Sequence, residues 1–144
     1  MIIRTHETLS ARSTATYSPC EQYRYALTRE WDAHGGRALF IMLNPSKADE
    51  IANDPTVERC ERRARALGFG AFRVTNIFAW RDTDPKAMRR AASPVGPQND
   101  RTLMQGVAWA DRIICAWGTH GAHLDRGPQV AAMLRDSGRS VHSL

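Results

Sequence analysis

The sequence predicts a three-layer α/β/α fold with a mainly parallel central sheet and an antiparallel hairpin near its start. Short apolar segments of strand length alternate along the chain with segments that carry apolar residues at helical spacing. Parallel strands need a crossover, which is usually a right-handed one through a helix. The 144 residues, 42% of them hydrophobic, suit a single domain over residues 1–144 with one core that needs no disulfide or metal.

The N-terminal part predicts an irregular segment followed by a hairpin. Residues 1–19 are interpreted as an irregular lead-in, because residues 5–19 are rich in Ser and Thr and lack a clear period. Residues 23–31 alternate apolar with polar side chains, which is typical of a strand with one wet face. A turn over residues 32–36 and a more apolar segment over residues 37–43 then predict an antiparallel hairpin whose second strand lies deeper in the sheet.

The central part predicts a helix and a second buried strand. Asp54 can cap free backbone amides and Pro55 suits the first helical position, so a helix begins here. Gly68 and Gly70 end it, and residues 72–80 form the strand. Apolar residues at helical spacing mark the buried face of the helix: Val57, Cys60, Ala64 and Leu67.

The C-terminal part continues the alternation of helix and strand. Gly127 and Pro128 open a helix that Gly138 stops. We predict a short helical turn over residues 88–90, a helix over 98–109 and a third buried strand over 112–117. The helix that begins at Gly127 covers residues 127–137, and a last strand covers residues 140–144.

The basic composition favours an anionic partner. A net charge of +5 and a pI near 9.6 raise encounter rates with nucleic acid, nucleotides or phosphorylated metabolites. Almost all the basic residues are Arg, which a coding bias alone also explains. The net charge alone therefore does not identify the partner.

Cysteine usage and hydropathy favour a cytoplasmic protein with no membrane contact. Cys20, Cys60 and Cys115 are too widely spaced for a disulfide framework or a four-cysteine metal site within this chain. His120 and His123 are spaced too loosely with Cys115 to predict a metal site, so we expect no metal. No segment has the apolar core of a signal peptide or approaches the roughly 20 apolar residues of a membrane span.

Polar or unusual residues occur where each predicted strand ends. In parallel sheets, ligands bind at the carboxyl ends of the strands, so we expect these residues to converge in one cleft. Arg81, which follows the second central strand, would lie beside it with Arg89 and Arg90. The strand-end residues are Asn44, Pro45, Ser46, Asn76, Trp117, Gly118 and His142.

Structural explanations exist for the same residues. Asn44 before proline is a common turn starter. Asn76 lies among apolar neighbours, where an unpaired amide costs about 1–3 kcal/mol, and it can be a structural buried amide. His142 can simply be exposed. The chain has no G-x-S-x-G, G-x-x-x-x-G-K-S or G-x-G-x-x-G motif, which argues against common hydrolases, nucleoside triphosphatases and dinucleotide enzymes.

Two family resemblances follow from the order of the motifs. "FIMLNPSKAD", "DPTVERC", "VTNIFAWRDTDP", "GPQND" and "CAWGTHG" together resemble, over nearly the whole chain, an uncharacterised bacterial and phage family known only as a domain of unknown function. The order of "LNPS", "VTNIF", "CAWG" and "VHSL", across residues 38–144, resembles the uracil-DNA glycosylase superfamily and implies its fold.

The second resemblance implies roles in cleavage of an N-glycosidic bond. It implies that Asn44 positions a water for attack on the sugar carbon, while Pro45 and Ser46 shape a loop against a phosphate. Asn76 would read a base edge, and His142 would donate a hydrogen bond to the base. Trp117 and Gly118 match the third motif. The chemistry needs no cofactor, and the implied partner is a nucleobase-containing ligand or a single-stranded nucleic acid.

The sequence departs from that pattern in three places. Met42 and Leu43 stand where the superfamily has a glycine, Ser143 stands where it has a proline, and the C-terminus at Leu144 is short, as in a truncated version. Flipping a base out of a duplex needs a wedge, so a free base, nucleoside or single strand fits better. A non-catalytic nucleotide-binding or nucleic-acid-binding module of the same fold, or a protein-interaction domain, are the alternatives. The sequence does not indicate the oligomeric state.

Overall fold

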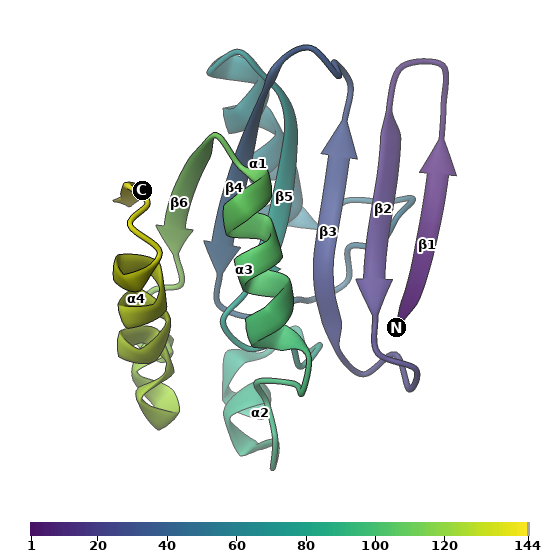
Figure 1. Cartoon of the computed structure of the whole chain (residues 1–144). Helices are drawn as coiled ribbons and strands as arrows, with labels where there is room; N and C mark the ends of the chain where they lie inside the picture. Colours follow the sequence, from purple (N-terminus) through teal and green to yellow (C-terminus); the bar gives the residue numbers. More distant parts are fainter. Residues whose placement is uncertain (144) are drawn as a thin grey trace.

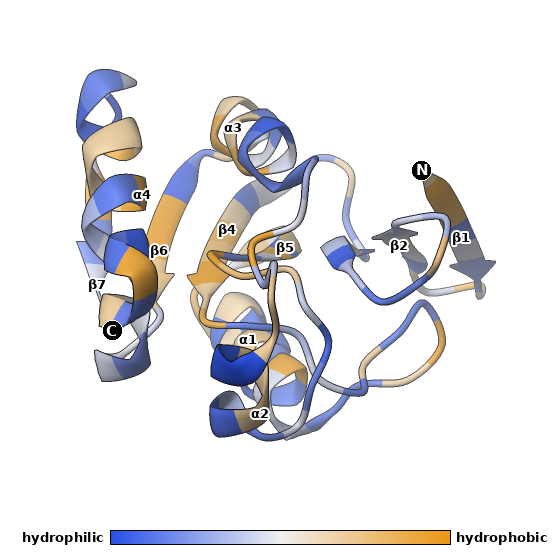
Figure 2. Cartoon of the chain, turned by 90° about the horizontal axis from the view of Figure 1, so that it is seen from below, coloured by the Kyte–Doolittle hydropathy of each residue, from blue (hydrophilic) through white to orange (hydrophobic). Residues whose placement is uncertain are grey.

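The computed structural model describes residues 1–143 and contains a seven-stranded mixed sheet with helices on both faces (Figures 1 and 2). The strands lie in the order β1-β2-β3-β5-β4-β6-β7. Their bounds are Ile2–Glu7 (β1), Arg12–Tyr17 (β2), Arg24–Glu30 (β3), Gly36–Met42 (β4), Phe69–Asn76 (β5), Arg112–Ala116 (β6) and Val141–Ser143 (β7). The helices are Pro55–Ala66 (α1), Pro85–Arg90 (α2), Asn99–Trp109 (α3) and Arg126–Asp136 (α4), with a 3-10 segment, η1, over Thr119–Asp125.

The predicted α/β class is confirmed, with antiparallel strands at the N-terminus and parallel strands in the centre. Strands β5, β4, β6 and β7 pair in parallel, and β1, β2, β3 and β5 pair antiparallel. The sheet is therefore mixed rather than mainly parallel, since three of the pairings between these strands are antiparallel and three are parallel.

The irregular lead-in predicted for residues 1–19 is wrong, because β1 and β2 form a hairpin there. Alternate residues of β2 are buried, namely Ser13, Ala15 and Tyr17. Two of these three inward side chains are small and one is polar, so the period of two that marks a strand was hidden in the sequence.

The hairpin predicted for residues 23–43 is also wrong, because β5 lies between β3 and β4. Val74 of β5 pairs with Leu27 on one side and with Phe40 on the other. The backbone N–H groups of Trp31 and Asp32 donate to the Gly70 carbonyl at 2.9 and 3.0 Å. The connection between β3 and β4 therefore runs past the start of β5 instead of closing a tight turn.

Two charged residues of the segment 23–31, which was expected to have one wet face, are buried. Arg24 and Arg29 of β3 are 2% and 6% exposed. Arg24 Nη1 donates to the Ala48 carbonyl at 2.9 Å, and Arg29 Nη2 donates to the Asp49 carbonyl at 2.5 Å. The segment after β4 thus crosses these arginines, and burial lowers the pKa of Arg24 to about 10.

Helix α1 covers one face of the sheet, and its predicted start is confirmed. The Asp54 carboxylate accepts from the Val57 N–H at 2.9 Å, and Pro55 is the first helical residue. Val57, Cys60 and Ala64 are buried, as their spacing predicts, but Leu67, predicted on the same face, is exposed because the helix ends at Ala66. They pack against Phe40, Phe72 and Val74 of the sheet in one core cluster.

Helices α3 and α4 cover the opposite face (Figure 2). Leu103 and Val107 of α3 and Val130 and Leu134 of α4 pack with Leu39 of the sheet. Both helices lie where the sequence predicted them, to within a residue at each end. Within residues 1–143, no helix is long and apolar enough to cross a membrane.

Candidate functional site

The parallel strands end together at one edge of the sheet, the lower edge in Figure 1. Met42 is the register partner of both Asn76 and Ala116. Beyond the strands, the Ile77 and Phe78 N–H groups each donate, at 3.0 Å, to the Met42 and Leu43 carbonyls respectively. The segments that follow β4 and β5 therefore continue side by side.

Asn44 joins these two segments. Its side-chain Nδ2 donates to the Asp82 carbonyl at 2.9 Å and approaches the carbonyls of Pro45 at 3.3 Å and Trp80 at 3.4 Å. The Asp82 N–H in turn donates to the Pro45 carbonyl at 2.9 Å. Because the NH2 group is held this way, the direction of the Asn44 Oδ1 is fixed, and this oxygen accepts no hydrogen bond from residues 1–143.

A cavity of about 290 Å³ lies beside Asn44, and we call it the Asn44 cavity. The ends of β4 and β6, the first turn of α1 and the start of α2 line it. Its polar side chains come from Asn44, Ser46, Asp54, Thr56, Asp82 and Thr83. Both carboxylate oxygens of Asp54 already accept backbone hydrogen bonds, from the Val57 N–H at 2.9 Å and from the Ala48 N–H at 3.3 Å.

An adjoining cavity of about 410 Å³ shares Ser46, Asp82 and Thr83 with the Asn44 cavity. Lys47 and Arg81 also line it and bring positive charge, while Glu21, which lines it too, pairs with Arg4. Arg81 Nη1 donates to the Glu21 carbonyl at 3.0 Å, and its guanidinium lies over the Tyr17 ring, 4.9 Å from the centroid. The structure therefore brings together Asn44, Pro45, Ser46 and Arg81.

Trp117 and His142 lie elsewhere. They line a cavity of about 280 Å³ between α4 and the strands β6 and β7, together with Cys115. Burial raises the pKa of the Cys115 thiol to about 11, so it stays protonated at neutral pH. His142 is exposed and pairs with Ile114. Asn44 and His142, the two expected catalytic residues, thus line separate cavities.

Gly118 has a local structural explanation. Its φ of +71° lies in the region that favours glycine, and nothing lies within 4 Å of a Cβ added there. Its conformation lets the chain turn from β6 into η1.

Asn76 is 2% exposed, and its Oδ1 is buried with no hydrogen-bond partner in residues 1–143. Its backbone carbonyl accepts from Asn99 Nδ2 at 2.8 Å, and the same Nδ2 donates to the Ile77 carbonyl at 3.0 Å. The expected base-reading side chain is therefore inside the fold at the end of β5, where Asn99 holds the backbone.

Neither Asn99 nor Arg126 is among the predicted site residues. Arg126 is 1% exposed, and its Nε donates to the Ile77 carbonyl at 2.7 Å. Its Nη2 pairs with Asp100 at 2.6 Å, and Nη1 donates to Gln129 at 2.9 Å. Both residues begin helices, which hid their role, because polar residues at helix starts are ordinarily interpreted as caps.

We expect Asn99→Ala to lower the free energy of unfolding by about 1–3 kcal/mol, because it removes a donor shared by two buried carbonyls. Asn76→Ala should cost clearly less: the side-chain oxygens of both residues are buried without a partner in residues 1–143, but only the Asn99 side chain donates to buried carbonyls. Urea unfolding of both variants measures the difference. An equal or larger loss in Asn76→Ala would contradict the assigned contacts.

Residues 1–143 contain no group of three or more His, Cys, Asp or Glu side chains that could hold a metal ion. The fold and the site define an α/β domain with a mixed sheet and polar cavities at the carboxyl edge of its parallel strands. The chain belongs to the family described as "Protein of unknown function (DUF1643)", which matches residues 24–144. Comparison with curated proteins and with solved structures found no match.

The expected membership of a family of unknown function over nearly the whole chain is thereby confirmed. The match begins at Arg24, the first residue of β3, so the hairpin of β1 and β2 precedes it. The comparisons give no evidence for a link to the uracil-DNA glycosylase superfamily.

Proposed function

We propose that this protein is a glycosylase-like domain that binds a nucleobase-containing ligand in the Asn44 cavity. The observation that carries the proposal is the orientation of Asn44. Its NH2 group is held by the Asp82 carbonyl at 2.9 Å, while its Oδ1 is a fixed acceptor without a partner in residues 1–143. A preorganised acceptor in a cavity is what a reaction that uses one oriented water requires.

The residues of the cavity suit cleavage of an N-glycosidic bond. In this reaction the bond between the sugar carbon and the base nitrogen breaks, and its electron pair leaves with the base. The water oxygen bonds to the sugar carbon, and a water proton ends on the base or in solvent. Asn44 Oδ1 would accept a hydrogen bond from that water, and the Asp82 carboxylate lies in the same cavity, where negative charge favours a cationic sugar.

The volume of the Asn44 cavity and the cations of the adjoining cavity favour a small ligand with a phosphate. The volume of about 290 Å³ lies just below the roughly 300–1,000 Å³ of ligand pockets, which suits a base or nucleoside. Lys47 and Arg81 in the adjoining cavity can pair with a phosphate. A nucleotide or the end of a single strand would fill both cavities.

A second candidate is a non-catalytic module that binds the same ligands. The separation of His142 from Asn44 favours it, because no histidine among the described residues lines the Asn44 cavity to donate to a leaving base. Such a module would bind its ligand in the Asn44 cavity and release no base.

The test is a thermal-shift titration of the full chain with bases, nucleosides, nucleotides and short single strands at low and high salt, followed by chromatography for released base. A ligand at 100 times its Kd stabilises the fold by about 2.7 kcal/mol, so binding raises Tm. For a ligand that binds, we expect Asn44→Ala to lose base release while it retains binding. His142→Ala is the control and should release base at the wild-type rate.

The outcomes of this titration decide between the two candidates or reject both. Binding without base release by the wild-type chain would favour the non-catalytic module. If no member of the panel raises Tm, both candidates are rejected. Loss of release in His142→Ala would contradict the separation of the two residues and restore His142 as a catalytic residue.

A further inference from the structure

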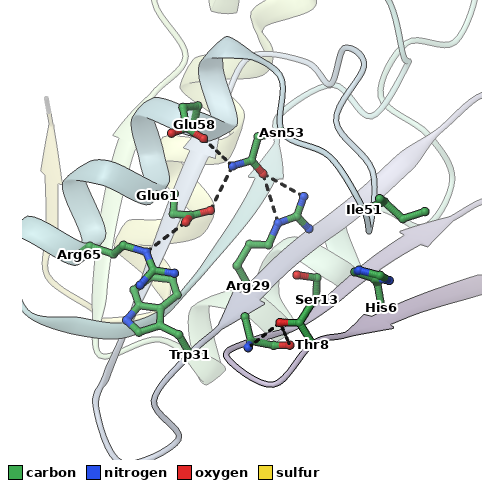
Figure 3. A pocket seen from close by; sticks show the side chains of 11 residues that line it. His6, Thr8, Ser13, Arg29, Trp31, Ile51, Asn53, Glu58, Glu61 and Arg65 are labelled. Carbon is green, nitrogen blue, oxygen red and sulfur yellow. Dashed lines mark hydrogen bonds and ion pairs between the residues drawn. The ribbon is translucent and has the colours of Figure 1, made fainter.

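A pocket of about 420 Å³ lies between α1 and the antiparallel strands β1, β2 and β3, on the face of the sheet that α1 covers (Figure 3). Residues 51–53 close one side of it. We call it the Arg29 pocket, because Arg29 of β3 lies at its centre. Neither the predicted strand ends nor the proposed function involves this pocket.

Three polar side chains lie in register across the floor of the pocket. His6 of β1 pairs with Ser13 of β2, and Ser13 pairs with Arg29 of β3. Paired residues project from the same face of a sheet, so the imidazole, hydroxyl and guanidinium form one row. Figure 3 shows the guanidinium between Asn53 on one side and Ser13 and His6 on the other.

Arg29 is 6% exposed, and not all of its hydrogen-bond donors have an acceptor among the described residues. Its Nε and Nη2 donate to Asn53 Oδ1 at 3.2 and 3.0 Å, and Nη2 also donates to the Asp49 and Ala52 carbonyls. Nη1 is buried and has no partner in residues 1–143. A buried donor without an acceptor is costly, so this nitrogen marks the position where a ligand acceptor would be stabilised.

The positive charge of Arg29 is likewise unpaired within residues 1–143, although Glu58 and Glu61 line the same pocket. Asn53 Nδ2 donates to Glu58 at 2.8 Å and to Glu61 at 3.1 Å. Their other oxygens pair with Arg62 and Arg65, at 3.1 and 3.0 Å. The two carboxylates are thus already matched by cations of α1, and Asn53 lies between them and Arg29.

An aromatic wall completes the pocket. The Trp31 ring lies beside the row, with the Arg65 guanidinium 4.0 Å from the ring centroid. An apolar group can contact the indole while an anionic group reaches Arg29.

We infer that the Arg29 pocket binds the carboxylate of a small organic anion. Arg29 Nη1, the Ser13 hydroxyl and the His6 imidazole are the donors, and Trp31 contacts the apolar part of the ligand. A singly charged group is favoured over a phosphate dianion, because Arg29 brings one positive charge that is unpaired within residues 1–143, and Glu58 and Glu61 already pair with Arg62 and Arg65. This inference does not depend on the nucleobase proposal.

The test uses benzoate as the probe, with benzamide as its uncharged analogue and inorganic phosphate as the dianion, at constant ionic strength. The indole N–H signal of Trp31 in a two-dimensional NMR spectrum of the full chain, assigned with Trp31→Phe, reports binding. Benzoate should shift this signal and bind at least about tenfold more tightly than either comparison ligand, a difference of about 1.4 kcal/mol. Equal affinity for benzamide, or no shift with benzoate, overturns the inference.

Variants separate the pocket from general charge effects. Arg29→Lys removes the guanidinium fork and should weaken benzoate binding about tenfold or more. Arg73→Lys is the matched control: Arg73 is in the neighbouring strand β5, donates to the Thr28 hydroxyl at 2.9 Å and lies over Trp109 instead. Its benzoate affinity should equal that of the wild type.

A second variant keeps the test decisive if Arg29→Lys fails to fold. The double variant His6→Ala and Ser13→Ala removes two of the three donors and little packing, because His6 is exposed and Ser13 is small. Benzoate affinity should fall while the Tm of the free protein changes little. Unchanged benzoate affinity in this variant would overturn the assignment.

Discussion

Replacement of Phe72 by alanine is expected to lower the free energy of unfolding by about 3–5 kcal/mol, the cost of emptying a large buried aromatic position. Phe72 is 0% exposed and belongs to β5, the strand inserted between β3 and β4. Its ring packs edge-on against Phe40, with centroids 6.2 Å apart, and lies 6.0 Å from Trp31. The backbone on both sides of the site is held by sheet hydrogen bonds, so the cavity cannot close easily.

Urea unfolding of Phe72→Ala measures the loss. Leu67→Ala is the control, because Leu67 is an exposed residue at the end of α1 and should change the free energy by no more than about 0.5 kcal/mol. A similar small change in Phe72→Ala would mean that β5 does not pack between β3 and β4 as described.

The helices could be predicted from the sequence because their signals are local. Asp54 and Pro55 lie next to each other in the chain and act on the amides of the same turn, so their effect does not depend on distant residues. The spacing of Val57, Cys60 and Ala64 likewise identifies the buried face of α1 whatever it packs against.

The order of the strands could not be predicted in the same way, because it depends on contacts between distant residues. The connection after β3 has turn residues, which alone favour a hairpin. What separates β3 and β4 is strand β5, whose Gly70 carbonyl accepts from Trp31 and Asp32, almost forty positions earlier in the chain. Nothing local in residues 31–36 encodes that partner.

The candidate site was predicted in part. The rule that polar residues gather at the ends of parallel strands placed Asn44, Ser46 and Arg81 correctly beside one another. It did not predict that β6 lies between β4 and β7, so that His142 of β7 lines a different cavity from Asn44.

The Arg29 pocket was not predicted, because Arg29 belongs to a strand whose sequence pattern is typical of solvent exposure. Alternation of apolar and charged residues in residues 23–31 indicated a solvated face. In the structure, Arg29 projects from the same face as the apolar Leu27, where residues 47–53 and α1 cover it, and Asn53 and backbone carbonyls replace the water around it. Only the fold shows that an arginine of an alternating strand is buried here.

Gly70→Ala is expected to lower the free energy of unfolding by about 3 kcal/mol, at the upper end of the usual cost of overpacking. A Cβ at this position would lie 2.1 Å from the Asp32 carbonyl oxygen and 2.8 Å from the Gly35 Cα. Both are backbone atoms, so no side chain can rotate away to relieve the contact. The chain must shift where the Gly70 carbonyl accepts from Trp31 and Asp32, near the start of the strand that lies between β3 and β4.

Gly68→Ala is the matched control two residues away. Nothing lies within 4 Å of its added Cβ, so only the positive φ of +84° opposes the substitution, at a cost of about 1–2 kcal/mol. Urea unfolding of both variants, with backbone amide NMR signals of Trp31 and Asp32 as local reporters, separates steric clash from backbone strain. If Gly70→Ala costs no more than Gly68→Ala and leaves those two signals in place, the close approach of Gly70 to residues 32–35 is not what holds β5 between its neighbours.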